Sequence, residues 1–147
     1  AHVASAQGIH AVENIAGRET EPLSYDDMPR ATYCHPQVAS FGLTEKQAKE
    51  KGFKIKIGKF PFLGNGKAIA IDDFEGIVKL VVDAEYGDLL GAHLIGPEAS
   101  ELLANIRMAK ELEYSVEDVG KTVHAHPTLS EAIMESALAA GEGAIHI

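Results

Sequence analysis

The sequence predicts an α+β domain, in which helices cover one face of an antiparallel β-sheet. Residues 77–96, IVKLVVDAEYGDLLGAHLIG, form two apolar runs around a turn at Tyr86–Gly87–Asp88. Strands joined by so short a turn are antiparallel. Residues 53–57 alternate apolar side chains with lysines, the pattern of a strand with one wet face. Helical patterns follow these strands, an order typical of the α+β class.

The first segment, residues 1–16, places apolar side chains on one helical stripe, and Gly17 is a suitable end for that helix. Residues 18–30 are charged and contain two prolines, so we expect a linker there. The chain opens in helical rhythm and without a methionine, which we interpret as the middle of a longer protein. No signal peptide is predicted, because a basic start and a continuous apolar stretch are both missing.

The next segment, residues 31–43, is rich in β-forming side chains but is interrupted by Pro36. Proline cannot donate to a β-ladder, so two short strand pieces are expected. Thr44 and Gln47 then form a capping-box pattern at the start of a short helix, which Gly52 ends.

The later elements are a loop and three helices. Residues 63–76 begin glycine-rich and predict a loop that re-enters regular structure near Ala68. Pro97 opens a helix with a clear apolar face that runs to about residue 113. Ser115 and Asp118 are suitable caps for a short helix, and a final helix is expected over residues 128–140.

Composition restricts the possible functions. The chain has 22 Asp and Glu against 13 Lys and Arg, a net charge of −9, which disfavours nucleic acid as a partner. No apolar run approaches the ~20 residues that span a bilayer. Cys34 is the only cysteine, so no internal disulfide or catalytic cysteine pair can form, and a cytoplasmic location is expected. Neither a G-x-G-x-x-G fingerprint nor a P-loop is present.

Chemistry-bearing residues gather in TVHAHPTLSEA, residues 122–132, for which three interpretations stay open. Thr128 and Glu131 could cap the final helix, with Pro127 fixing the turn before it. His124, His126 and Glu131 could bind a metal, although the spacing is not a usual zinc pattern. His126 and Glu131 could also act as an acid/base pair, in which the carboxylate orients the imidazole and stabilises its protonated form.

The same stretch resembles the C-terminal signature of the flavin- and NAD-dependent disulfide oxidoreductases, above all the dihydrolipoamide dehydrogenases. Further segments resemble that family in the same order: AHVASAQG, AVENIAG, YCHPQVASFGLTE, GKFPF and LLGAHLIGPEASELL. The resemblance implies that residues 1–20 are the last helix of an FAD domain plus a linker. It implies that residues 21–147 are the interface, or dimerisation, domain of a larger enzyme.

The resemblance also implies a role for particular residues. His126 is expected to be the general base that deprotonates dihydrolipoamide, and Glu131 to orient it, within the active site of a partner subunit in a homodimer. Ala1, His2, His126 and Pro127 are expected to lie against the flavin. FAD and NAD are implied for the parent enzyme, and we expect the isolated chain to bind neither and to be inactive.

Two other functions remain as alternatives. An acidic interface domain could dock the acyltransferase core of a 2-oxoacid dehydrogenase complex, and the histidine stretch could form a metal hydrolase. Cys34 is expected to be a small buried apolar group and His93 a packed, hydrogen-bonded side chain. The first helix is expected to be mobile, docked elsewhere or swapped onto a neighbour.

Overall fold

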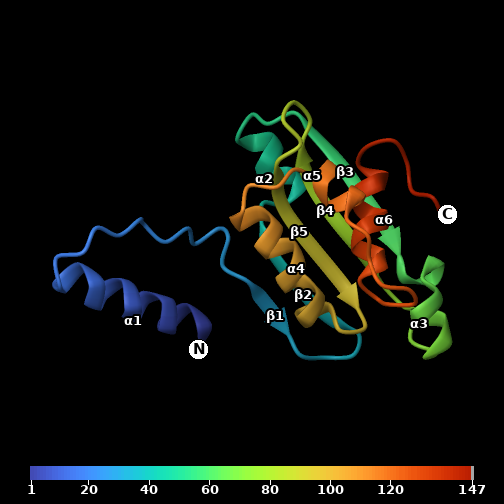
Figure 1. Ribbon diagram of the computed structural model, residues 1–147, viewed down its shortest axis with the longest axis horizontal. Helices are drawn as coiled ribbons and strands as arrows, with labels where there is room; N and C mark the ends of the chain where they lie inside the picture. The colour runs from blue at the N-terminus through green and yellow to red at the C-terminus, as the bar shows by residue number, and fades with distance from the viewer. Residues whose placement is uncertain (147) are drawn as a thin grey trace.

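The centre of the computed structural model, which describes residues 1–146, is a five-stranded antiparallel sheet (Figure 1). Every neighbouring pair of strands is antiparallel, and the α+β class is therefore confirmed. The order across the sheet is β1-β2-β5-β4-β3, with the bounds β1 Arg30–Thr32, β2 Gln37–Gly42, β3 Ile55–Pro61, β4 Ile77–Asp83 and β5 Leu89–Gly96.

The hairpin of β4 and β5 confirms the turn that the sequence predicts. The Asp83 side chain holds this turn, since its Oδ1 accepts hydrogen bonds from the backbone N–H groups of Glu85 (2.8 Å) and Tyr86 (2.9 Å). The register shifts between Val81 and Val82, where the ladder is irregular. Central strands in this arrangement are buried on both faces over part of their length, as the runs of apolar residues indicate.

The interruption at Pro36 separates β1 from β2, as predicted, and the His35–Pro36 peptide bond is cis. The prediction for Cys34 is wrong, because this thiol is exposed in the connection between the two strands. Its Sγ lies 3.2 Å from the Pro36 carbonyl oxygen. His93 behaves as predicted, since its Nε2 lies 3.1 Å from the Leu43 carbonyl oxygen in a partly buried position.

The helices are α2 Glu45–Glu50, α3 Gly66–Ala70, α4 Ala99–Glu111, α5 Val116–Lys121 and α6 Glu131–Ala139, with a 3-10 turn at Phe62–Gly64. Helices α4, α5 and α6 cover one face of the sheet (Figure 1). The short helix α2 adds cover to the opposite face, where Ala48 packs with Val81. The predicted caps of α2, by Thr44 and Gln47, and of α5, by Ser115 and Asp118, both form as capping boxes.

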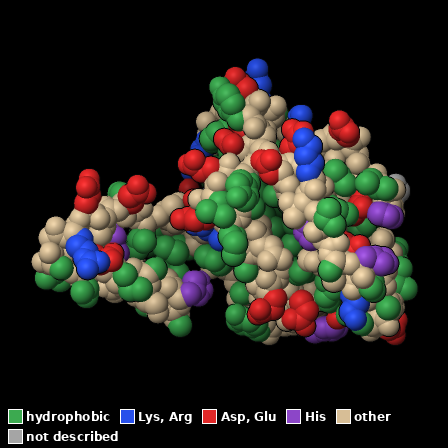
Figure 2. Space-filling model, in the orientation of Figure 1, with side chains coloured by type: hydrophobic (Ala, Val, Ile, Leu, Met, Phe, Trp, Pro, Cys, Tyr) green, Lys and Arg blue, Asp and Glu red, His purple; other side chains and the backbone are tan. Residues whose placement is uncertain are grey.

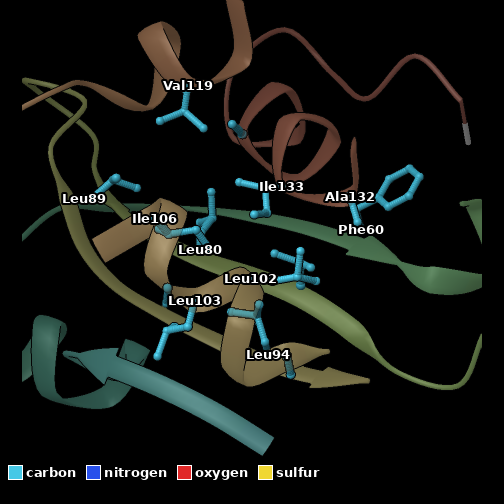
Figure 3. Packing of buried hydrophobic residues seen from close by; sticks show 14 of the residues in the cluster. Phe60, Leu80, Leu89, Leu94, Leu102, Leu103, Ile106, Val119, Ala132 and Ile133 are labelled. Carbon is cyan, nitrogen blue, oxygen red and sulfur yellow. The ribbon is translucent and has the colours of Figure 1, made fainter. Parts of the chain in front are cut away.

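The main core lies between the sheet and helices α4 to α6 (Figure 3). Leu80 of β4, Ile106 of α4 and Ile133 of α6 are at most 1% exposed. Helix α6 also approaches β3 closely at Gly58, where a Cβ atom would lie 1.9 Å from the Ser136 carbonyl oxygen. A side chain at position 58 would therefore push α6 off the sheet.

Helix α1, His2–Ile15, stands apart from the sheet at the end of a linker without helix or strand (Figure 1). It buries none of its residues, and Ile15 is 86% exposed. Its contacts are with the linker: His2 Nε2 lies 2.8 Å from the Pro29 carbonyl oxygen, and Gln7 donates to the Tyr25 hydroxyl. The predicted boundary at residue 20 and the predicted mobility of this helix stay predictions. Within residues 1–146, no helix is long and apolar enough to cross a bilayer.

Candidate functional site

His126 and Glu131 meet at the connection between α5 and α6. The Nδ1 atom of His126 lies 2.9 Å from the Oε1 atom of Glu131, so the predicted approach of the two side chains is confirmed. The two side chains differ in burial, since that of His126 is 77% exposed and that of Glu131 only 19% exposed. A carboxylate accepts, so the ring donates from Nδ1. The other ring nitrogen, Nε2, is then the atom that can take up a proton.

The second carboxylate oxygen of Glu131 fixes the loop before the helix. The Thr128 backbone N–H donates to Oε2 at 2.8 Å, which is one half of the predicted capping box. The other half does not form, because the Thr128 hydroxyl accepts no hydrogen bond from the Glu131 N–H and instead donates to the Ala125 carbonyl at 2.7 Å. The helix consequently begins at Glu131 with Ser130 as its N-cap residue, and not at Thr128 as predicted. Glu131 thus holds the loop and the imidazole at once.

Asn65 is a positioning residue that sequence reasoning missed. It is 3% exposed, its Nδ2 donates to the Thr128 carbonyl at 3.0 Å, and its Oδ1 accepts from the Ala68 N–H at the start of α3. An asparagine before a helix predicts the cap on α3. The second contact joins residues 63 positions apart, and no local pattern predicts it.

The electrostatics keep Glu131 ionised. Burial acts to raise its pKa, but the hydrogen bonds from the Thr128 N–H and from His126 act in the opposite direction. The positive charges of His126 and His146 add to that effect, and the net pKa lies below the ordinary value of 4.5. A carboxylate near a helix N-terminus is also favoured by the helix dipole. At neutral pH the imidazole therefore has an anionic partner.

The metal interpretation lacks support from the geometry. His124 turns to its own loop, where its Nδ1 lies 2.8 Å from the Thr122 carbonyl oxygen. Its ring lines a different depression from that of His126, beside Met108 of α4 and Leu112, which follows that helix. Among residues 1–146, no three His, Cys, Asp or Glu side chains gather closely enough to hold a metal ion.

The other predicted cofactor contacts lie far apart. The His126–Pro127 peptide bond is cis, and both residues are exposed at the same loop. Ala1 and His2 are also exposed, but they are the N-cap and the first residue of α1, which the structure places away from α6 (Figure 1). The structure therefore brings His126, Pro127 and Glu131 together and leaves Ala1 and His2 elsewhere.

A second histidine–carboxylate pair lies beside the first. Glu135 and His146 line a small recess of about 70 Å³ together with His126 and Glu131. Histidine side chains are visible on the surface over α6 in Figure 2. Sequence reasoning did not single out either residue of the second pair. The spacing of four residues between Glu131 and Glu135, which places both on one helix face, was the available signal.

Comparison with known proteins gives a consistent result. A family model described as the pyridine nucleotide-disulphide oxidoreductase dimerisation domain matches residues 28–137. The chain is 54% identical over 140 residues to the dihydrolipoyl dehydrogenase of Corynebacterium glutamicum, covering 93% of this chain and 30% of the relative. It is 49% identical over 146 residues to that of Bacillus subtilis, covering 99% of this chain and 31% of the relative.

A solved structure shows the same fold. The crystal structure of LpdA from Mycobacterium tuberculosis matches with a TM-score of 0.87 at 24% identity, over 93% of this chain and 30% of that one. At this identity the likeness concerns the fold alone. The chain spans about 30% of the length of the relatives that it matches.

Proposed function

Because the chain belongs to the pyridine nucleotide-disulphide oxidoreductase family, as its dimerisation domain, we propose that it supplies His126 as a general base to the active site of a partner subunit. The parent enzyme in this proposal is a dihydrolipoamide dehydrogenase that works as a homodimer. The observation that carries the proposal is the exposed imidazole of His126 on a mostly buried, ionised Glu131. A base delivered to another subunit has to lie at the surface and has to be held rigidly.

The proton step follows from the geometry. The neutral ring donates from Nδ1 to Glu131, so Nε2 carries the lone pair that takes a proton from a thiol of dihydrolipoamide. The imidazolium that forms faces the Glu131 carboxylate at hydrogen-bond distance, and the pair of opposite charges stabilises it. Correctly placed general bases accelerate reactions by roughly 10²–10⁴-fold.

The cofactors belong elsewhere in this proposal. FAD and NAD⁺ accept the electron pair of the dithiol in such an enzyme. The recess beside His126 holds about 70 Å³, which is small beside the roughly 300–1,000 Å³ of ordinary ligand pockets. We propose that both cofactors and the redox-active cysteine pair lie on other domains of the parent enzyme, with residues 1–20 as the last helix of its FAD domain plus a linker.

A chimera tests the role of His126. This chain replaces the matching segment of the Corynebacterium glutamicum relative, to which it is 54% identical, and reduction of NAD⁺ by dihydrolipoamide is measured. His126→Gln should lower kcat by roughly 10²–10⁴-fold. His124→Gln is the matched control, because His124 contacts its own loop, and it should retain the activity. A fully active His126→Gln chimera would refute the proposal.

Subunit exchange tests delivery to the partner. One inactive chimera carries His126→Gln, and a second lacks the redox-active cysteines of its upstream domain. Random 1:1 exchange in a two-fold dimer should restore about a quarter of the full activity, because half of the dimers are mixed and each contains one intact site. No recovery, with mixed dimers present by mass spectrometry, would show that the base acts within its own subunit.

A second candidate function is docking of a basic domain from the acyltransferase core of a 2-oxoacid dehydrogenase complex. The net charge of −9 is compatible with it. A cleft between the β4–β5 turn and helices α5 and α6 is lined by Glu85, Glu117 and Glu142, with Lys56 and Lys121 as the basic side chains. Lys121 is already paired with Glu117. Binding of such a domain that does not weaken with added salt would argue against this function.

A further inference from the structure

Glu135 is a buried carboxylate that the proposed chemistry does not use. It lies in α6, and its side chain is 2% exposed. Within residues 1–146, all hydrogen bonds to its side chain come from the chain after the helix. The Ile145 N–H donates to Oε2 at 2.8 Å, and the His146 ring nitrogen Nδ1 lies 2.5 Å from Oε1. His146 itself is exposed, so this pair repeats the arrangement of His126 and Glu131.

These contacts hold the chain after α6 against the helix. The positive φ of Gly143 (119°) allows the chain to turn back, and its N–H donates to the Leu138 carbonyl at 3.0 Å. Ala144 then packs against the main core. Figure 1 shows this last segment beside α6. Within residues 1–146, His146 is the only basic side chain that pairs with Glu135. A buried carboxylate without partners is costly, so the carboxylate and the segment stabilise each other.

The same segment borders the site of the proposed base. Glu131 and Glu135 project from one face of α6 because they are four residues apart. His146 lines the recess that also contains His126 and Glu131. Its charge contributes to the lowered pKa of Glu131, which indicates that the two pairs are electrostatically coupled. The position of the tail, residues 141–146, therefore determines the shape of the recess on the side of His146.

We propose that Glu135 is a positioning residue: it fixes the tail as one wall of the recess and thereby sets how a dithiol approaches His126. The second half of this proposal rests on the proposed function. The docked tail restricts the directions from which a dithiol can approach His126. Release of the tail removes this restriction, so the substrate is less well oriented. The effect is expected mainly on KM, since His126 and Glu131 themselves stay in place.

Hydrogen exchange on the 147-residue chain tests the docking of the tail. The Ile145 amide should exchange slowly in the unaltered chain and about ten-fold or more faster in Glu135→Leu, which removes the acceptor without a large change in volume. Glu142→Gln is the matched control, since Glu142 is an exposed carboxylate on the same tail, and it should leave the rate unchanged. Thermal unfolding by circular dichroism reports whether each variant keeps its fold. Glu135→Gln, which retains one acceptor oxygen, should give a smaller acceleration and serves if the leucine variant does not fold.

Kinetics of the chimera test the consequence for the substrate. Glu135→Leu should raise the KM for dihydrolipoamide by about three-fold or more and lower kcat by a smaller factor, the opposite of the split expected for His126→Gln. An Ile145 amide that is unprotected in the unaltered chain, or unaffected by Glu135→Leu, would overturn the docking of the tail. A released tail with an unchanged KM would overturn its role at the site. The exchange rate of the Ile145 amide and the KM of Glu135→Leu are both measured independently of the activity of His126→Gln. Failure of this proposal is therefore distinguishable from failure of the proposed function.

Discussion

The two oxygens of Glu131 have different partners, and this difference predicts an unusual order of activities for variants at this position. Oε2 accepts from the Thr128 backbone N–H and Oε1 accepts from the His126 ring. In Glu131→Gln, the single carbonyl oxygen has to serve the Thr128 N–H, because an amide NH₂ cannot accept from it. The NH₂ group then faces His126 Nδ1 and donates to it. The ring then favours the tautomer with hydrogen on Nε2, and in this tautomer Nε2 cannot take up a proton.

The magnitude follows from these bonds. Turning the Gln amide over leaves the partly buried Thr128 N–H without an acceptor, at a cost of about 1–3 kcal/mol. That cost limits the population of the productive tautomer to roughly 1 in 5 to 1 in 150 of the molecules. The lost carboxylate charge lowers the rate by about another five- to ten-fold. The two factors together predict that Glu131→Gln loses roughly 25- to 1,500-fold in kcat. Glu131→Ala leaves the ring free to adopt either tautomer, and since His126 is well exposed the loss should be about ten-fold.

The assay is steady-state reduction of NAD⁺ by dihydrolipoamide with the chimera, with His126→Gln as the lower limit. Thermal unfolding checks that both Glu131 variants remain folded. The conservative glutamine should be the less active substitution. If Glu131→Gln equals or exceeds Glu131→Ala in kcat, the tautomer of His126 is not set by this carboxylate.

Three further predictions concern stability. Ile106→Ala should lower the free energy of unfolding by about 2–5 kcal/mol and Ile106→Val by about 0.5–1.5, measured by urea denaturation, because this side chain is 0% exposed between α4 and the sheet; equal effects would indicate a core that collapses around the gap. Gly58→Ala should destabilise by about 1–3 kcal/mol or more through the clash with the Ser136 carbonyl, whereas Gly66→Ala, whose Cβ meets no atom within 4 Å, should be neutral or slightly stabilising. The pKa of Glu131 is lower in the folded chain than its ordinary value of 4.5, so the ionised carboxylate contributes its full stabilisation above about pH 4.5. This stabilisation is lost as the pH falls through the lower pKa of the folded state. The unfolding free energy of Glu131→Gln should therefore fall less steeply below about pH 4.5 than that of the unaltered chain.

Local patterns predicted the elements of this fold because each depends on residues that are neighbours in the chain. The hairpin of β4 and β5 and the box of Thr44 and Gln47 are examples. Competition between local bonds explains the misplaced start of α6. The Thr128 hydroxyl contacts Ala125 and Ser130 within the loop, and the side chain lies where it does not accept from an N–H of the helix. Cys34 was misjudged because a single thiol carries no periodic signal of burial.

The residues of the candidate site also fall into those that local sequence predicts and those that it does not. His126 and Glu131 are five residues apart, so their contact could be predicted from the sequence. Asn65 reaches Thr128 across 63 residues and depends on how α3 is placed beside the loop, which only the folded chain determines. Glu135 was missed because a glutamate in an amphipathic helix usually faces solvent. Its burial results from the turn at Gly143, which returns the tail to α6.

The proposed role of His126 requires a ring that is accessible and yet held in place, and the difference in burial within the first pair meets both requirements. A fully buried imidazole could not reach a substrate held by another subunit, and a fully exposed pair would be screened by water and free to rotate. Here the carboxylate is anchored by the Thr128 N–H, and the Thr128 carbonyl is in turn anchored by Asn65, whereas the ring extends outward. The rotational freedom of His126 is thus reduced before a partner subunit binds, as the proposed role of general base requires. The same reasoning explains why the chain places this pair at the start of a helix packed on Gly58, since the rigid contact of α6 with the sheet fixes the base of the loop.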